Sequence, residues 1–293
     1  MLLQTEVKNC CLPFERFEEN AFFCGIGSCF AVELFEYLRS VGLATTVNPT
    51  GIVYNLISMA APLRRLVEQK FYTEGDFFKF NEQWHSWEHH GDFSKQSLEI
   101  AVSSANHALS EFASALMNSS ALVLTPSSSV VYVHKVTGKV VANCHRVPGN
   151  EFERRLLTHV ENFAALNAII NDIMSLNPLC KIILTLSPVR HYRGDLILNS
   201  RSKAHLVTAI HSCVERYPEK CAYFPAYEIM NDELRDYRFY KEDMLHPSDL
   251  AVKIIIKRFI NAIFTESAVI NVNSGIKLAS TGKHIPRKHK ILP

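Results

Sequence analysis

Short runs of apolar residues alternate along this chain with longer segments whose apolar residues recur at helical spacing. The apolar runs predict five strands, at residues 22–26, 43–47, 121–125, 181–186 and 222–224. The helically spaced segments predict helices at residues 30–42, 57–70, 98–117, 150–174 and 200–216, and a last one that starts at Pro247. Strands that alternate with helices predict an α/β fold, a three-layer α/β/α sandwich around a mostly parallel sheet.

Two stretches depart from this alternation. Residues 52–97 lack strong strand signals and are rich in aromatic residues and histidine, which predicts an inserted segment covering one end of the sheet. Residues 130–142 predict a β-hairpin with a short turn at Thr137 and Gly138. We expect one domain over residues 1–270 and a basic, disordered tail over residues 271–293.

Composition narrows the function. The 293 residues are 47% hydrophobic and carry a formal net charge of +2, too little to predict a nucleic-acid or membrane partner. No signal peptide and no apolar run of ~20 residues is visible. The eight cysteines include no CxxC pair, which is typical of reduced, buried thiols and favours a cytoplasmic location.

The first candidate catalytic residues lie between the strand predicted at 22–26 and the helix predicted at 30–42. Gly25 and Gly27 break the apolar run and place Ser28 on a tight turn at the start of the helix, beside outward-pointing N–H groups. Ser28 is therefore either a nucleophile or an ordinary helix cap. Cys29 is an alternative nucleophile, because a thiol in the first helical turn has a lowered pKa, but we expect its side chain to point into the core.

A second candidate group lies near the end of the chain. Asp243 precedes His246 by three residues, just before the last helix. A serine nucleophile needs an imidazole to accept its proton, and the imidazole needs an acceptor that fixes its tautomer. Asp243 and His246 would supply both functions from one loop.

Together these residues resemble a known family. Gly27-Ser28-Cys29-Phe30-Ala31 reproduces the motif that names the GSCFA domain family, and further matching blocks lie at residues 48–52, 84–90, 141–148, 187–191 and 243–246. The family is similar to SGNH hydrolases, which are esterases on a flavodoxin-like fold. The resemblance implies a Ser28–His246–Asp243 triad, with Gly51 offering a backbone N–H to an oxyanion.

The third SGNH block departs from the pattern. Relatives have Leu-Gly-Thr where this chain has Pro126-Ser127-Ser128, so the glycine that lets a backbone approach an oxyanion is missing. We expect the hydroxyl of Ser127 or Ser128 to replace it.

Other polar residues are candidates for binding substrate. His89 and His90 lie in the aromatic insertion, and His145 lies in a loop after the hairpin. These histidines either face substrate or are structural, and no nearby carboxylate or cysteine has zinc-ligand spacing. Arg190, after the strand at 181–186, either binds an acidic substrate group or forms a structural ion pair.

These features predict a serine hydrolase that acts on an ester, namely an acyl group on a sugar, a polysaccharide or a small metabolite. No metal or organic cofactor is required. Two alternatives remain open from the sequence: an acyltransferase that uses the same triad, and a binding module that has lost turnover.

Overall fold

The computed structural model describes residues 5–8, 10–191 and 195–272. Five parallel strands form its central sheet: β1 (Phe23–Gly27), β2 (Thr45–Val47), β5 (Ala121–Thr125), β9 (Lys181–Thr185) and β10 (Cys221–Phe224). Their order across the sheet is β10-β9-β5-β1-β2, which is the flavodoxin-like order. The prediction of an α/β sandwich around a parallel sheet is therefore confirmed.

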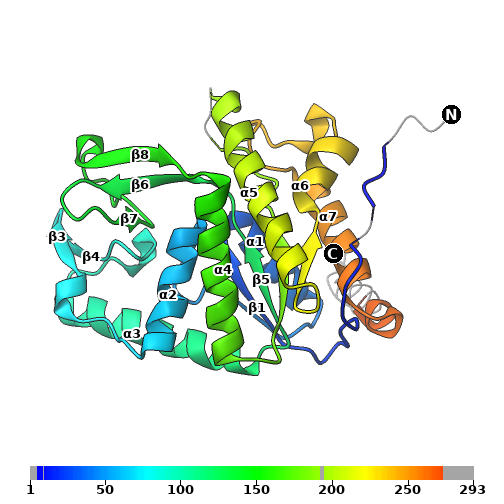
Figure 1. Cartoon of the computed structure of the whole chain (residues 1–293), viewed down its shortest axis with the longest axis horizontal. Coiled ribbons are helices and arrows are strands. Elements are labelled where there is room, and N and C mark those ends of the chain that lie inside the picture. Colours follow the sequence, from blue (N-terminus) through cyan, green and yellow to red (C-terminus); the bar gives the residue numbers. More distant parts are fainter. Residues whose placement is uncertain (1–4, 9, 192–194, 273–293) are drawn as a thin grey trace, which may run out of the picture.

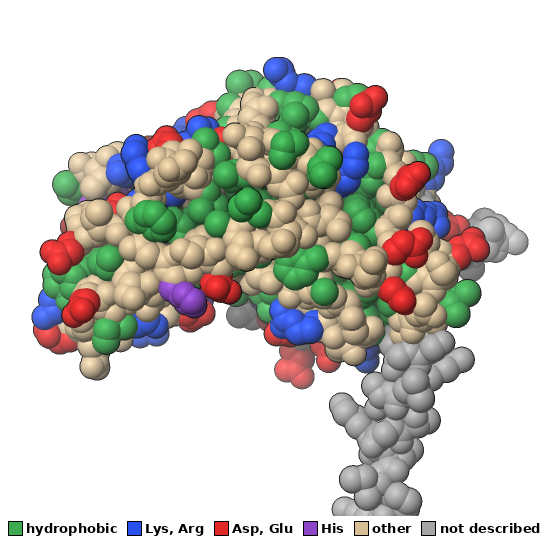
Figure 2. Space-filling model, turned by 90° about the horizontal axis from the view of Figure 1, so that it is seen from below, with side chains coloured by type: hydrophobic (Ala, Val, Ile, Leu, Met, Phe, Trp, Pro, Cys, Tyr) green, Lys and Arg blue, Asp and Glu red, His purple; other side chains and the backbone are tan. Residues whose placement is uncertain are grey.

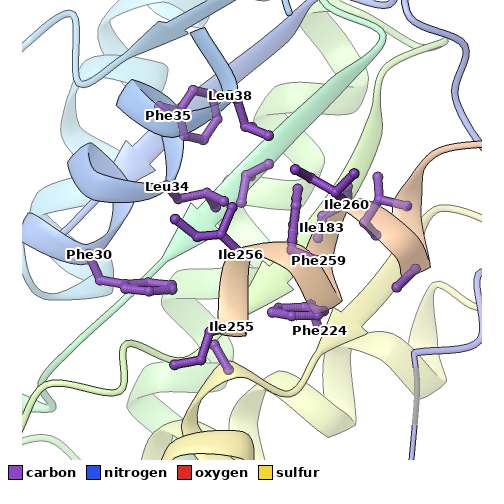
Figure 3. Close-up of a cluster of buried hydrophobic side chains, with 14 of the residues drawn as sticks. Phe30, Leu34, Phe35, Leu38, Ile183, Phe224, Ile255, Ile256, Phe259 and Ile260 are labelled. Atoms are coloured by element: carbon purple, nitrogen blue, oxygen red, sulfur yellow. The ribbon is translucent and has the colours of Figure 1, made fainter. Parts of the chain in front are cut away.

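Alternate residues of the inner strands point to opposite faces, and each face is covered by helices. On one face, Phe23, Val123 and Ile183 pack under α1 (Cys29–Ser40) and α7 (Asp249–Ile263). Figure 3 shows the aromatic and branched side chains of these two helices meeting over the sheet. Burial on both faces explains why these strands are continuous apolar runs.

The opposite face is covered by four helices: α2 (Leu56–Glu68), α3 (Leu98–Asn118), α4 (His159–Leu176) and α5 (Leu196–Arg216). The strand residues between those of the first face, including Cys24, Leu122 and Ile182, pack against them. In Figure 1 the helices α4 and α5 lie in front of β1 and β5, with α7 to the right. The smaller helical turns are α6 (Ala226–Glu228) with residues 229–233, and residues 74–76, 91–93, 149–151 and 237–239.

The predicted helix over residues 150–174 starts too early. Residues Phe152–Leu156 form strand β8, antiparallel to β6 (Val130–His134), and the helix begins at His159. β7 (Val140–Val141) pairs with the other edge of β6, as the hairpin prediction required. Residues 152–156 form a strand because they pair with β6. The helix α4 starts later, at the capping box that Thr158 forms with Glu161.

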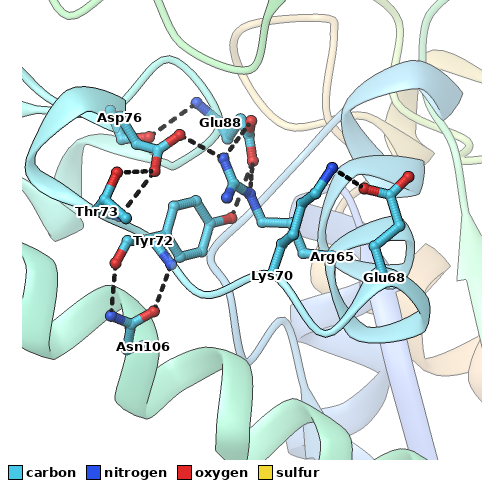
Figure 4. Close-up of polar contacts among 9 residues, drawn as sticks. Arg65, Glu68, Lys70, Tyr72, Thr73, Asp76, Glu88 and Asn106 are labelled. Atoms are coloured by element: carbon cyan, nitrogen blue, oxygen red, sulfur yellow. Dashed lines mark hydrogen bonds and ion pairs between the residues drawn. The ribbon is translucent and has the colours of Figure 1, made fainter.

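The aromatic segment also differs from the prediction at its start. Residues 56–68 are α2, which belongs to the sandwich, so the insertion proper follows it and holds β3 (Phe78–Phe80) and β4 (Gln83–His85). Figure 4 shows how Arg65 of α2 holds this segment, with its guanidinium bonded to Asp76 and Glu88. In Figure 1 these strands gather with β6, β7 and β8 at the left, beside α2.

The end of the chain differs from the prediction by two residues. α7 begins at Asp249 rather than Pro247, because the Ser248 side chain caps it by accepting the Ala251 N–H. The predicted disordered tail at 271–293 lies almost wholly outside the described residues.

Figure 2 shows charged side chains of both signs interspersed around one face of the molecule.

Candidate active site

A cavity of about 420 Å³ lies at the carboxyl ends of the parallel strands, where ligands bind in open α/β sheets. Cys29 enters it from the start of α1, Asn55 from the start of α2, and Ser128 from the loop after β5. His191 and His246 complete the polar wall, and the apolar wall comes from β6, β7 and the residues beside them. The cavity thus joins segments that are more than 200 residues apart in the sequence.

The predicted pair of Asp243 and His246 forms. The Nδ1 atom of His246 is 2.6 Å from Oδ2 of Asp243, and the backbone N–H groups of Leu245 and His246 donate to Oδ1 at 2.9 and 3.0 Å. These N–H groups, and then the His246 ring, hold the pKa of the Asp243 carboxyl well below its usual range. A carboxylate accepts hydrogen bonds, so it fixes the proton on Nδ1 and leaves Nε2 as the proton acceptor.

The loop that carries this pair is held by backbone bonds on both sides. The Arg190 N–H donates to the Leu245 carbonyl at 3.0 Å, and the Lys241 N–H donates to the His246 carbonyl at 2.8 Å. Met244, between the two catalytic candidates, adopts a φ of 59°, which turns the chain so that the carboxylate reaches back to the ring. The loop therefore positions His246 from the backbone, independently of a bound substrate.

Ser28 lies at the predicted turn, but in an enclosed environment. It is the residue before α1, yet its side chain makes no capping bond. The residue is 0% exposed, and its Oγ atom has no hydrogen-bond partner among the described residues. Its backbone N–H donates to the Thr125 carbonyl at 3.2 Å, so that N–H is not free to stabilise an oxyanion.

Cys29 differs from its expectation in two respects. Its side chain contacts the core but also lines the cavity, together with His246. Burial, and after it the charge of Glu33, raises the pKa of the Cys29 thiol, while the Phe30 and Cys29 N–H groups and Lys203 oppose this shift. Desolvation outweighs the helix N-terminus here, so the expected lowering of the pKa is wrong.

Gly51 serves the turn after β2. Its φ is 96°, and its N–H donates to the Asn48 carbonyl at 2.8 Å, so this N–H is satisfied within the turn. The Asn48 side chain in turn accepts the Gly27 N–H at 2.7 Å. The implied role of Gly51 as an oxyanion donor is not supported, and these bonds instead tie the turn to the end of β1.

The serines after β5 occupy two different places. The N–H groups of Ser127 and Ser128 both donate to the Tyr54 carbonyl, at 2.8 and 3.1 Å. The Ser127 side chain is buried and bonds to Nε2 of His191, whereas Ser128 lines the cavity and its Oγ accepts the Val130 N–H. Of the two hydroxyls predicted to replace the missing donor, only that of Ser128 lies at the cavity.

Asn55 is a cavity residue that the sequence did not single out. Its Oδ1 accepts the Ser58 N–H at 2.9 Å, which caps α2 and identifies the amide nitrogen as the remaining polar atom. The residue is 5% exposed and lines the cavity. The sequence signal that could have identified Asn55 is its position, as a polar residue between the strand predicted at 43–47 and the helix predicted at 57–70.

The three histidines predicted to face substrate lie elsewhere. His89 is fully buried between the rings of Tyr72 and Phe93, with neither ring nitrogen bonded among the described residues. His145 is 7% exposed and its Nε2 is 2.8 Å from the Ser86 carbonyl. His90 pairs with Asp92. None of the three histidines lines the cavity.

Arg190 lies on the far side of the Asp243 loop. Its guanidinium stacks over the Tyr240 ring at 4.3 Å, and it lines a separate hollow of about 600 Å³ that also contacts Asp243.

Among the described residues no group of three or more His, Cys, Asp or Glu side chains converges as metal ligands would. None of the described helices has the length and apolar content needed to cross a bilayer.

The fold and this site define an α/β protein with a Gly-Ser-Cys turn and a histidine–carboxylate pair at the carboxyl edge of its sheet. The chain belongs to the GSCFA family, whose sequence model matches residues 23–259, so the predicted family is confirmed. Proteins with curated descriptions give no match.

Solved structures with a similar chain course include esterases. A mutant of an acetyl-xylooligosaccharide esterase from Geobacillus is 11% identical, with a TM-score of 0.44 over 86% of this chain and 98% of that one. A carbohydrate esterase of family 3 from Talaromyces cellulolyticus is 10% identical, with a TM-score of 0.40 over 91% of this chain and 100% of that one.

Proposed function

We propose that this chain cleaves an acyl ester, with His246 as the general base and Asp243 as the residue that orients it. The observation that carries the proposal is the 2.6 Å contact between His246 Nδ1 and Asp243 Oδ2, with His246 at the wall of the cavity. A histidine whose far nitrogen is free to accept a proton beside a cavity is suited to activating a nucleophile.

The nucleophile comes from the turn between β1 and α1. The sequence names Ser28 there, with Cys29 as the alternative, and the turn lies at the same edge of the sheet as His246. An ester carbonyl bound in the cavity would be attacked from this turn, and His246 would pass the proton to the leaving alcohol. The amide nitrogen of Asn55, which lines the cavity, would stabilise the oxyanion.

The cavity wall supports a small substrate. Val130, Val131, Val141 and Ala142 form an apolar wall that suits a short acyl chain. Tyr132 and Asn143 add polar groups at the same wall, which suits a hydroxylated alcohol such as a sugar. We place the reaction in the cytoplasm, since all eight cysteines are free.

The test is to replace Asp243 by Asn and His246 by Ala and to measure kcat on short p-nitrophenyl esters and acetylated sugars. Asp243→Asn should lower kcat at least ~10-fold, about 1.4 kcal/mol of barrier, because the amide favours the wrong tautomer of His246. His246→Ala should lower kcat further. Asp236→Asn is the matched control, since Asp236 caps the exposed turn at 237–239, pairs there with Arg238, and does not line the cavity.

Thermal melts of the same variants separate catalysis from folding. Wild-type turnover by a normally folded Asp243→Asn variant would reduce Asp243 to a structural role. If His246→Ala also kept the wild-type rate, the proposed chemistry would be wrong.

A further inference from the structure

Ser28 and Cys29 are neighbours in sequence, but only one of them lies at the cavity. The Ser28 side chain is enclosed on all sides, and its residue is 0% exposed. Cys29 is partly exposed and lines the same cavity as His246, Asn55 and Ser128. Side chains of consecutive residues at a strand-to-helix turn point in different directions, so the one-residue offset decides which group a substrate can reach.

The backbone N–H groups show the same difference. The Ser28 N–H is used by the Thr125 carbonyl, whereas Cys29 is the first residue of α1, where an N–H has no partner within the helix. The N–H groups of Cys29 and Phe30 favour the charged form of the thiol, although burial outweighs them and raises the pKa of Cys29. An attacking atom on residue 29 would therefore meet a carbonyl beside the N–H groups of the first turn of α1.

A buried lysine also interacts electrostatically with the thiol. Lys203 of α5 is 1% exposed, and its Nζ donates to the Ser187 carbonyl at 2.7 Å. Burial lowers the pKa of Lys203 to about 7, and the one opposing influence is the charge of Cys29. A lysine in the interior close to a sulfur atom would stabilise a thiolate as it forms.

We propose that the nucleophile of this site is the thiol of Cys29 and not the hydroxyl of Ser28. This inference rests on the proposed ester-cleaving function and names its reacting atom. His246 accepts the thiol proton as the sulfur attacks the ester carbonyl, which forms a C–S bond. The C–O bond then breaks, and His246 returns the proton to the leaving alkoxide.

Water completes the cycle. His246 takes a proton from the water molecule as its oxygen attacks the thioester, and the C–S bond breaks. The acid leaves, and the proton on His246 returns to the sulfur. One ester and one water thus yield one acid and one alcohol, and no oxidant or reductant is consumed. Ser28 then serves the packing of the turn.

The experiment is to trap the acylated enzyme with p-nitrophenyl acetate, quench it in acid, and locate the acetyl group by peptide mass mapping of the wild-type chain. The acetyl group should lie on Cys29 and should be released by neutral hydroxylamine, as a thioester is. Cys29→Ala should lower the acylation rate at least ~100-fold, as loss of a nucleophile does. The matched control is Cys11→Ala, because Cys11 is exposed and far along the chain from the turn.

The outcomes separate the two proposals. An acetyl group on Ser28 that persists in Cys29→Ala overturns the assignment of Cys29 and leaves the ester-cleaving function in place. If the wild-type chain is acylated no faster than the His246→Ala variant, both the ester-cleaving function and the assignment of Cys29 are wrong. Mapping on the wild-type chain needs no Ser28 variant, so the result stands even if Ser28→Ala fails to fold.

Discussion

Gly27 shows how closely the turn before α1 is packed. A Cβ atom added at this position would lie 2.5 Å from the Thr125 carbonyl oxygen and 2.8 Å from the Thr125 Cβ. Both are closer than side-chain carbons come in proteins, and the near atoms belong to a central strand that cannot shift easily. The glycine is therefore required by contact with β5 as well as by the turn.

We expect Gly27→Ala to destabilise the protein by about 1–3 kcal/mol, the usual range for overpacking, and to reduce activity by moving the start of α1. Urea unfolding and kcat measured on the same preparation test this. Gly149→Ala is the matched control, because a Cβ atom there meets nothing within 4 Å. Equal stability of the two variants would contradict the packing argument.

At the scale of elements, the start of α4 depends on a few local bonds. The Thr158 side chain accepts the Glu161 N–H at 3.3 Å, and the Glu161 carboxylate accepts the Thr158 N–H at 2.9 Å. The Thr158 N–H, and then the Arg155 side chain, lower the pKa of Glu161 to about 2. This capping box separates β8 from the helix.

Thr158→Ala should lower the free energy of unfolding by about 1 kcal/mol, because it removes an N-cap hydroxyl. Chemical denaturation checks this value. Thr208→Ala is the control, since the Thr208 hydroxyl only bonds back to the Ala204 carbonyl on the exposed side of α5. If Thr208→Ala lowers the free energy of unfolding as much as Thr158→Ala does, the loss in Thr158→Ala is not a specific capping effect.

At the scale of the whole molecule, the buried histidines couple stability to pH. Burial, opposed by the nearby Glu88 carboxylate, lowers the pKa of His89 to about 4, and burial likewise lowers the pKa of His145 to about 4. In the unfolded chain these rings have a pKa near ~6.5. Between pH 6.5 and 4 the unfolded state therefore binds more protons than the folded state, so stability falls as the pH falls.

We expect the free energy of unfolding to be highest above pH 6.5 and to fall by roughly 1–2 kcal/mol per buried histidine by pH 5. His89→Phe should reduce this slope, because it removes one titrating group. Phe93→Leu, which loosens the ring packed against His89 at 4.6 Å, should lower stability by the same amount at every pH. Parallel pH profiles for wild type and His89→Phe would show that His89 does not titrate on unfolding.

Much of the architecture could be predicted from local pattern. Four strands of the parallel sheet, β1, β5, β9 and β10, follow from apolar runs, since strands buried on both faces have no polar alternation. The edge strand β2 follows from its β-branched residues. The boundary at residues 150–158 could not be predicted, because apolar and polar residues alternate only weakly along β8. This segment is a strand through its pairing with β6. The exact start of α2 also depended on the Asn55 cap rather than on hydrophobic spacing.

The candidate site was predicted where one loop supplied the chemistry and missed where several segments had to meet. Asp243 and His246 are three residues apart, so the sequence itself brings the carboxylate to the ring. His89 and His90 lie in the aromatic insertion and His145 lies in the loop after the hairpin, but the fold brings none of the three rings to the cavity. Asn55 and His191 reach the cavity because of the order of the strands, which local spacing does not record.

The sequence by itself determined the family, the layered α/β class and the residue types of the site, because apolar runs, helical spacing and a contiguous motif are local properties. Only the tertiary structure decided which side chains meet. Whether residue 28 or residue 29 faces His246 depends on the direction in which β1 ends and on the seating of α1 against β5. Ser28 is buried there and Cys29 is partly exposed, and this burial is a property of the packed molecule.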